Sequence, residues 1–491
     1  MIRLFNLTAI ISVFVLGVCD PFIFKKAAFS QAEAGNGIIS FERSPFALSN
    51  PKVPDRPVPF WMISLPPGYD RPQDVVNAGA RWARYGGLEG LTWDLVENER
   101  GRYDWSRTDY MFSEAAKAGL NLVVVVMNWN HLDQPDVRAV NGGLSVKAPH
   151  DMAGFLNFLE KAVERYDGDG IDDALGSPVI NYWEIENEVD FDIFWSDTPE
   201  NYARLLKNCY KIIKKANPNA KVLIAGMSHQ PDLEKSRSYY FSIIKELDRI
   251  KDNPDDKYFD IFSFHLYNLN QDINVIPTMD SHVNAIREGL SKYGYFVPFW
   301  LTETGDYSGS PLAPAGAPST FKLFTKTENE QAASLFKIYV YSITHNVKKV
   351  FWLTLTEWSG YAGLKDNVFD NVGLINNPET DGQSHKKLSY YTYKNMVEIL
   401  DGSDLDAIRV IQEKDGIYIY RFMKNGKPVW AAWNNNPQEN QIVISGITSK
   451  QVKITEAVMR YGSGFKTKTE NVSDGRISVS LGSIPVLIGD N

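Results

Sequence analysis

An alternation of short apolar strands with amphipathic helices runs through most of this 491-residue chain and constrains its fold more than any other feature. The strands are almost continuously apolar, which is typical of strands covered on both faces in a parallel sheet. The eight expected strands are Phe60–Leu65, Arg81–Gly86, Leu122–Met127, 179–186, Lys221–Gly226, Phe259–His265, Phe299–Thr302 and Val350–Leu355. Eight β-then-α units between residues 58 and 401 predict a (β/α)8 TIM barrel.

Helix signals between these strands agree with the barrel. A set of apolar residues recurs at helical spacing between strands four and five: Tyr202, Leu205, Leu206, Cys209, Ile212, Ile213 and Ala216. Thr327 and Glu330 have the spacing of a capping box at the start of the helix before strand eight. The chain has only two cysteines, and the apolar setting of Cys209 predicts a buried free thiol.

The pattern changes after Asp401. Short alternating runs follow, separated by turn residues such as Lys424-Asn425-Gly426. This pattern predicts a second domain, a β-sandwich over residues 402–491. The polar, proline-bearing segment 35–57 is interpreted as an N-terminal extension that either lies along the sandwich or starts the barrel. The sequence leaves both possibilities open.

The N-terminus has the form of an export signal over residues 1–34. Arg3 precedes an uncharged apolar run, Leu7–Val18, which is too short for an ordinary transmembrane helix. Small residues that suit cleavage follow at 30–34. Leu16–Cys19 resembles a lipoprotein box, but Val18 stands where a small residue is usual. We therefore expect a secreted or periplasmic protein without a lipid anchor.

Composition excludes several classes of function. The net charge is −9, and no basic run suits a nucleic-acid partner. The seven histidines include no H-E-x-x-H arrangement, and no C-x-x-C spacing or P-loop is present. Elsewhere in the chain, no apolar segment is long enough to span a membrane. The sequence therefore predicts neither a bound metal nor a cofactor.

Carboxylates gather at the end of the fourth expected strand. The stretch NYWEIENEVD, residues 181–190, places Glu184, Glu186 and Glu188 at every second position. The reactive groups of TIM barrels lie at the carboxyl ends of the strands. Because side chains alternate along a strand, Glu184 is expected inside the barrel as a salt-bridge partner and Glu188 at the rim.

A second carboxylate, Glu303, ends the seventh strand in FWLTETGD. Strands four and seven face each other across the mouth of such a barrel, so the fold brings Glu188 and Glu303 into one site. Two facing carboxylates are the groups that glycoside hydrolysis needs. A separation of about 5 Å gives retention of anomeric configuration, and roughly 6.5–9.5 Å gives inversion.

These motifs carry a family resemblance that covers the whole barrel. WEIENEV is similar to the W-E-I-W-N-E-P signature of clan A glycoside hydrolases, and WLTETG resembles the nucleophile motif of that clan. Residues 80–105 resemble its strand-two segment, Phe264–Tyr267 its strand six and Phe351-Trp352 its strand eight. The overall pattern is most like family 39, the xylosidase-like and exopolysaccharide-hydrolase members, with family 5 as the alternative.

Two residues depart from the clan pattern. Glu186 replaces the usual tryptophan or small residue, and Val189 replaces proline. The first change would alter a sugar subsite, and the second would shift the loop slightly. The Asn187–Glu188 pair is retained.

The resemblance implies a role for each matching residue. Glu188 would be the general acid/base and Glu303 the nucleophile of a retaining enzyme. Asn187 would hold the sugar 2-hydroxyl, Arg84 would keep Glu303 ionised, and Trp352 would form the platform beneath the sugar.

Further candidates surround these residues. His265 and Tyr267 lie on one face at the end of strand six, where either a contact with Glu303 or a structural hydrogen bond is expected. Trp129 and His131 end strand three and are expected to line the site, with the alternative that His131 ties down its own loop. The remaining candidates are two packing residues, Trp93 and Glu97, and two outer-subsite residues, Trp358 and Tyr361.

The sequence thus predicts an exported, retaining β-glycoside hydrolase whose partner is a polysaccharide or oligosaccharide. Two alternatives use the same fold: a transglycosylase with the same residues, and a non-catalytic glycan-binding protein. The sequence does not identify the sugar, the choice between exo and endo cleavage, or the oligomeric state.

Overall fold

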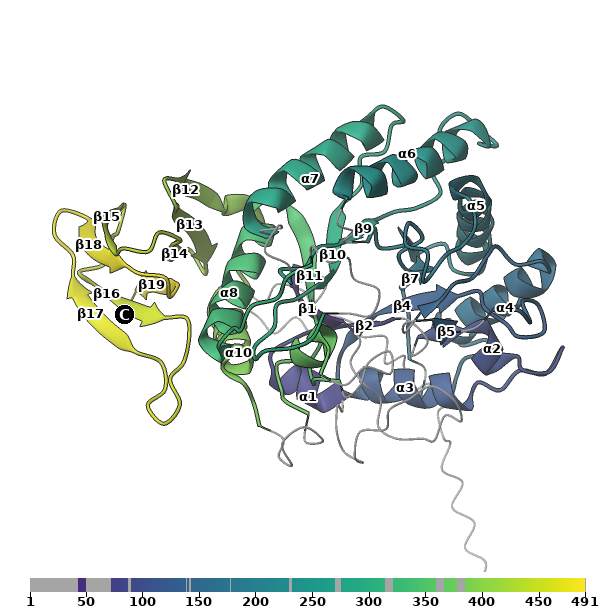
Figure 1. The fold of residues 1–491 in the computed structure, drawn as a ribbon, viewed down its shortest axis with the longest axis horizontal. Helices are drawn as coiled ribbons and strands as arrows, with labels where there is room; N and C mark the ends of the chain where they lie inside the picture. The colour runs from purple at the N-terminus through teal and green to yellow at the C-terminus, as the bar shows by residue number, and fades with distance from the viewer. Residues whose placement is uncertain are drawn as a thin grey trace, which may run out of the picture.

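The computed structural model describes residues 43–49, 72–86, 90–137, 139–140, 143–176, 178–228, 232–269, 275–313, 321–358, 366–377 and 385–490. Eight parallel strands form the barrel (Figure 1): β1 (Phe46–Ser49), β2 (Trp82–Tyr85), β4 (Asn121–Met127), β7 (Tyr182–Ile185), β8 (Lys221–Ile224), β9 (Phe262–His265), β10 (Phe299–Thr304) and β11 (Val347–Leu353). Parallel bridges such as Leu223 to Ile261 join β8 to β9 and close the barrel. The predicted (β/α)8 fold is confirmed.

The first strand is not where the sequence predicted it. Phe46–Ser49 pairs with β11 on one side and β2 on the other, so segment 35–57 contributes the first strand and the barrel begins before residue 58. The predicted strand Phe60–Leu65 lies outside the described residues. The true strand has only four residues, too few for a clear alternation pattern, although Phe46 and Leu48 pack outward and Ala47 packs into the barrel.

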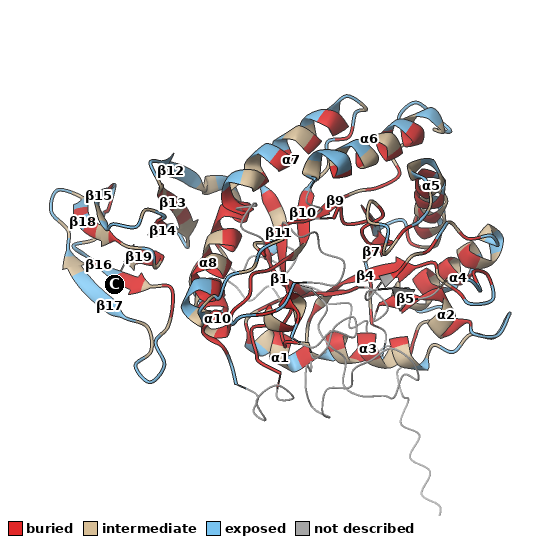
Figure 2. Ribbon diagram, in the orientation of Figure 1, coloured by how far each residue is buried: buried red, intermediate tan, exposed pale blue. Residues whose placement is uncertain are grey.

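Helices surround the strands and turn their buried sides toward them (Figure 2). They are α1 (Pro72–Asn77), α3 (Ser106–Lys117), α4 (Met152–Arg165), α5 (Pro199–Ala216), α6 (Leu233–Arg249), α7 (Val275–Ser291), α8 (Glu328–Thr344) and α10 (Leu388–Leu400). The capping box of Thr327 with Glu330 is present at α8. Cys209 is a fully buried free thiol on α5, as predicted. Among the described residues, no helix has the length and apolar character needed to cross a membrane.

The barrel interior is layered. Its lower layer is apolar and aromatic, formed by Ala47, Trp82, Val123, Leu223, Ile261, Trp300 and Phe351. Lys349 lies in this layer with its ammonium 4.5 Å from the centre of the Trp82 ring, and it donates to Ser44 O at 2.8 Å. Polar side chains begin above this layer, toward the carboxyl ends of the strands. The packed lower layer therefore forms a rigid floor beneath those polar groups.

The C-terminal domain is a sandwich of two unequal sheets, beside the barrel in Figure 1. The larger sheet has the order β12 (Arg409–Lys414), β13 (Ile417–Lys424), β14 (Lys427–Asn434), β19 (Val486–Asp490), β16 (Gln451–Glu456) and β17 (Thr467–Asn471); the smaller pairs β15 (Asn440–Ser445) with β18 (Arg476–Leu481). Alternation along β13 sends Ile417 and Ile419 into the sandwich core. The opposite face packs on the barrel, where Trp433 meets Phe336 of α8. The predicted sandwich is confirmed.

Candidate active site

Four strands bring charged side chains to one end of the barrel. Arg84 comes from β2, Glu184 and Glu188 from β7 and the turn after it, His265 from β9 and Glu303 from β10. Because these strands are parallel, their carboxyl ends meet at the same rim. Residues far apart in the sequence therefore form a single cluster.

The turn after β7 has an unusual backbone. Glu186 has φ +63° and Glu188 has φ +42°, a left-handed conformation that residues with a Cβ adopt only at a cost. These angles break the in–out alternation of the strand. Glu184 points into the barrel, the carboxyl of Glu186 accepts from the backbone N–H of Asn128 just after β4, and Asn187 and Glu188 reach the cluster. The strained turn thus presents two adjacent side chains to one site.

Arg84 is fully buried and organises the cluster through hydrogen bonds to three described side chains. Its Nε donates to Glu184 Oε2 at 2.6 Å, its Nη1 to Glu303 Oε1 at 2.7 Å, and its Nη2 to Asn187 Oδ1 at 2.8 Å. Burial alone would lower the pKa of Arg84, but Glu184 and Glu303 outweigh that effect and raise the pKa. The guanidinium therefore keeps its charge and fixes three side chains at once.

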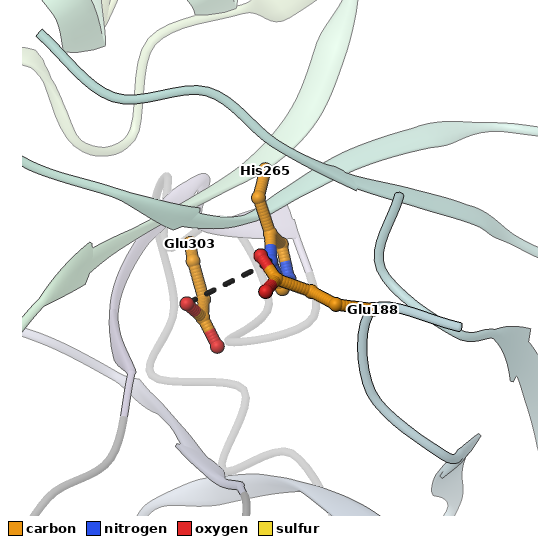
Figure 3. Close-up of side chains that lie close together, drawn as sticks. All are labelled: Glu188, His265 and Glu303. Atoms are coloured by element: carbon orange, nitrogen blue, oxygen red, sulfur yellow. Dashed lines mark hydrogen bonds and ion pairs between the residues drawn. The ribbon is translucent and has the colours of Figure 1, made fainter. Parts of the chain in front are cut away.

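The two rim carboxylates lie close together. The two carboxylates and a histidine ring converge in Figure 3, which shows Glu188, His265 and Glu303. One carboxylate oxygen of each glutamate and one ring nitrogen of the histidine lie within 4.8 Å of one another. His265 Nδ1 is 2.7 Å from Glu188 Oε1 and 3.7 Å from Glu303 Oε2. Tyr267 donates its hydroxyl proton to the same Glu303 oxygen. Both histidine and tyrosine therefore contact the carboxylate pair.

The surroundings separate the protonation states of the pair. Burial raises the pKa of Glu188, and the nearby Glu303 adds to this, while His265 opposes it only in part. Burial acts on Glu303 in the same direction, but His265, Arg84 and Tyr267 together outweigh it and hold the pKa of Glu303 below its ordinary value. One carboxyl is favoured as an acid and the other as a carboxylate, the division of roles that acid-assisted displacement needs.

The side chain of Trp352 is not at the rim, contrary to the expectation of a sugar platform. It is fully buried, belongs to the core between barrel and helices, and donates from Nε1 to Val372 O at 2.9 Å. Strand alternation explains the difference, because Phe351 points into the barrel and Trp352 points out. The next inward position on β11 is Leu353, which packs in one apolar cluster with Tyr267.

The other predicted residues differ in how they relate to the cluster. His131 is exposed and its ring contacts Asp94, so it ties down its own loop. Trp129 is half-buried against the barrel core. Glu97 accepts from Trp93 Nε1 and from Gly101 N, which confirms the packing and loop-fixing role of this pair.

The subsite predictions have mixed outcomes. Glu186 is buried at 1% exposure and its carboxyl accepts from the backbone N–H of Asn128, so its expected effect on a sugar subsite stays a prediction. No feature of the sequence indicates the positive φ that Glu186 adopts. Trp358 packs at the edge of the Tyr267 cluster, and Tyr361 lies outside the described residues.

Arg84→Met is expected to destabilise the fold by about 3–5 kcal/mol, because it leaves Glu184 and Glu303 buried without their shared cation. Urea unfolding followed by circular dichroism would measure the loss. Arg84→Lys is the matched control: it keeps the charge but not the three-way geometry, so its loss should be intermediate. An unchanged unfolding midpoint for Arg84→Met would contradict the organising role of this residue.

Comparisons with known proteins place this fold among glycoside hydrolase structures. No family model and no curated protein matches the chain. A family 39 glycoside hydrolase from Bacteroides cellulosilyticus WH2 superposes with a TM-score of 0.64 at 19% identity, over 92% of this chain and 82% of the other.

Two further structures agree with it. A monomeric β-xylosidase from Caulobacter crescentus CB15 has a TM-score of 0.56 at 12% identity, over 85% and 91% of the two chains. An α-L-arabinofuranosidase from Thermotoga maritima has a TM-score of 0.59 at 12% identity, over 92% and 98%. At these identities the likeness establishes a shared fold.

Proposed function

We propose that this protein is a retaining β-glycoside hydrolase of clan A in which Glu303 is the nucleophile and Glu188 the general acid/base. The observation that carries the proposal is the carboxylate pair: two rim glutamates with oxygens within 4.8 Å, one favoured as acid and one as carboxylate. Oxygens this close agree with the separation of about 5 Å between the carboxyl groups of retaining enzymes, which is shorter than the roughly 6.5–9.5 Å of inverting ones.

The reaction proceeds by two displacements. Glu303 attacks the anomeric carbon while Glu188 gives its proton to the departing glycosidic oxygen, and a glycosyl ester forms on Glu303. Glu188, now a carboxylate, removes a proton from water, the water oxygen attacks the anomeric carbon, and Glu303 is released. Two inversions restore the original configuration.

The residues around the pair have defined tasks in this scheme. Arg84 and Tyr267 hold the two oxygens of Glu303 and fix its orientation for attack. His265 bonds Glu188 and orients its carboxyl. Arg84 also occupies the amide oxygen of Asn187, so the amide NH₂ is the end that donates to the sugar 2-hydroxyl. No aromatic platform is assigned on β11, because Leu353 holds the inward position there.

A family 39 β-xylosidase from Caulobacter crescentus among the similar structures supports a substrate of β-linked sugars. An enzyme of the same family from Xanthomonas axonopodis pv. citri has the same fold. We propose further that the protein is exported, secreted or periplasmic, as its N-terminal sequence predicts, and that it acts on a polysaccharide or its oligosaccharides.

The pH dependence of kcat/KM is expected to be bell-shaped. Activity requires Glu303 ionised and Glu188 protonated. The pKa of Glu303 is lowered and that of Glu188 is raised from the ordinary 4.5. As the pH increases, kcat/KM should therefore rise where Glu303 ionises, below pH 4.5, and fall where Glu188 loses its proton, above pH 4.5. Initial rates across a pH series test this. A single ionisation that controls the rate on one side only would contradict the division of roles.

A substrate panel tests the proposal directly. Reducing-sugar release is measured for xylan, glucans, mannan, bacterial exopolysaccharides and aryl β-glycosides, with wild type beside Glu303→Gln. Release by wild type alone supports the hydrolase and names the substrate class. Binding without release would favour a non-catalytic glycan-binding protein, and sugar transfer to an added acceptor in place of hydrolysis would favour a transglycosylase.

A further inference from the structure

Glu186 is a buried carboxyl that the reaction scheme does not use. Its side chain is 1% exposed and its Oε1 accepts from the backbone N–H of Asn128 at 2.6 Å. Its own backbone N–H donates to Val126 O at 3.0 Å. Glu186 therefore binds the end of β4 through both its main chain and its side chain, at the two residues that flank Met127.

The partner of Glu186 is itself held firmly. Asn128 is fully buried, and its Nδ2 donates to Lys147 O at 3.0 Å. Gln134 donates to Asn128 Oδ1 at 3.4 Å and to the same Lys147 carbonyl at 3.0 Å. The hydrogen bond from Asn128 to Glu186 therefore joins the turn after β7 to an anchored loop.

Glu186 also opens the strained turn. Its φ of +63° and that of Glu188, +42°, lie on either side of Asn187. A left-handed conformation at residues with a Cβ persists only where surrounding contacts enforce it. The grip of Glu186 on β4 is such a contact, and it acts directly before the two residues that face the sugar in the proposed reaction.

We propose that Glu186 is a positioning residue for Asn187 and Glu188, because its carboxyl fastens the turn that carries them to the end of β4. The inference rests on the proposed function for its effect on catalysis. Residue 186, a position where the clan has tryptophan or a small residue, thus sets the geometry of the acid/base in this protein.

The environment of Glu186 favours its uncharged form. Tyr202 and Cys209 of α5 and Glu184 and Glu188 of its own segment are the titratable groups nearby, and no hydrogen-bonded cation accompanies the carboxyl among the described residues. Burial raises the pKa of Glu186 to about 8, partly offset by the Asn128 N–H. A glutamine amide, neutral and with the same acceptor oxygen, is therefore a close substitute.

Two variants of similar size separate positioning from packing. Glu186→Leu removes the acceptor, and we expect kcat to fall about tenfold or more with little change in KM, because the acid/base is displaced while sugar contacts elsewhere remain. Glu186→Gln keeps the acceptor and should restore most of the lost kcat. The assay uses whichever aryl β-glycoside the substrate panel identifies, at a pH below the pKa of Glu186.

A matched control isolates stability. Tyr166, a fully buried residue directly after α4, donates its hydroxyl to Thr108 Oγ1 of α3 at 2.7 Å. Tyr166→Phe should lower the melting temperature and leave kcat unchanged, because neither helix carries a residue of the cluster. If Glu186→Leu keeps more than half of the wild-type kcat, or if Glu186→Gln falls as far as Glu186→Leu, the positioning role is wrong.

A crystal structure of Glu186→Leu tests the geometry without any substrate. We expect the backbone at 186–188 to relax from its left-handed angles and the Arg84 to Asn187 hydrogen bond to break. An unchanged turn would overturn the inference even in an active enzyme. A relaxed turn in a protein that hydrolyses no glycoside would sustain the positioning of Glu188 and refute the proposed function alone.

Discussion

Glu303→Gln is expected to lower kcat on aryl β-glycosides by on the order of 10⁴-fold or more, the scale on which loss of a nucleophile slows other enzymes. The amide cannot form the glycosyl ester, because its oxygen is a far weaker nucleophile than the carboxylate that Arg84 and His265 favour. The substitution keeps the size of the side chain and an acceptor for Arg84. The fold should therefore survive, as circular dichroism and the melting temperature would show.

The control for this result is the covalent intermediate. A 2-deoxy-2-fluoro aryl glycoside should label wild type on the peptide that contains Glu303, detectable by mass spectrometry, and leave Glu303→Gln unlabelled. Retention of more than a tenth of wild-type activity by the variant, or labelling at another carboxylate, would remove Glu303 from the nucleophile role.

Glu188→Ala is expected to be nearly inactive on substrates with poor leaving groups. On aryl glycosides with good leaving groups, its turnover should recover when azide is added. An aryl glycoside with a good leaving group needs no proton, so the glycosyl ester on Glu303 still forms. Its hydrolysis stalls because no base activates water. Azide needs no base and fits the space left by the carboxylate, so a β-glycosyl azide should accumulate.

The anomeric configuration of the azide product distinguishes the two glutamates. In Glu303→Gly the azide would replace the nucleophile and displace the leaving group once, which gives the α-glycosyl azide from a β-glycoside. Nuclear magnetic resonance of the products reads the configuration. An α-azide from Glu188→Ala, or no rescue with a good leaving group, would argue against Glu188 as the acid/base.

Much of the barrel could be predicted because its strands are buried on both faces and therefore appear as continuous apolar runs. Seven of the eight expected strands lie within three residues of their predicted ends. The first strand was missed because four residues, Phe46–Ser49, give too short a pattern to separate from a loop. Its identity depends on pairing with β11 and β2, which is information that only the closed sheet contains.

The sequence predicted the members of the cluster that depend on which residue type ends a strand. It did not predict those that depend on which way a side chain points from the strand. Glu188, Glu303, Arg84, His265 and Tyr267 meet as expected because parallel strands align their carboxyl ends. The motif match placed Trp352 beside the sugar, but its position in β11 turns the indole toward the helices. The hydrogen bond between Asn128 and Glu186 accompanies a positive φ at Glu186, and no residue type in the sequence indicates that conformation there.

The three-way contact of Arg84 has an evolutionary consequence. A lineage that lost Glu184 by random substitution would leave the buried Arg84 guanidinium short of a counter-charge, and the chain would lose folded protein as well as any chemistry. Selection for folding alone therefore guards the Arg84–Glu184 pair against genetic drift. A descendant that abandoned the reaction could lose Glu303, but it would need a compensating change at Arg84 before it could lose Glu184.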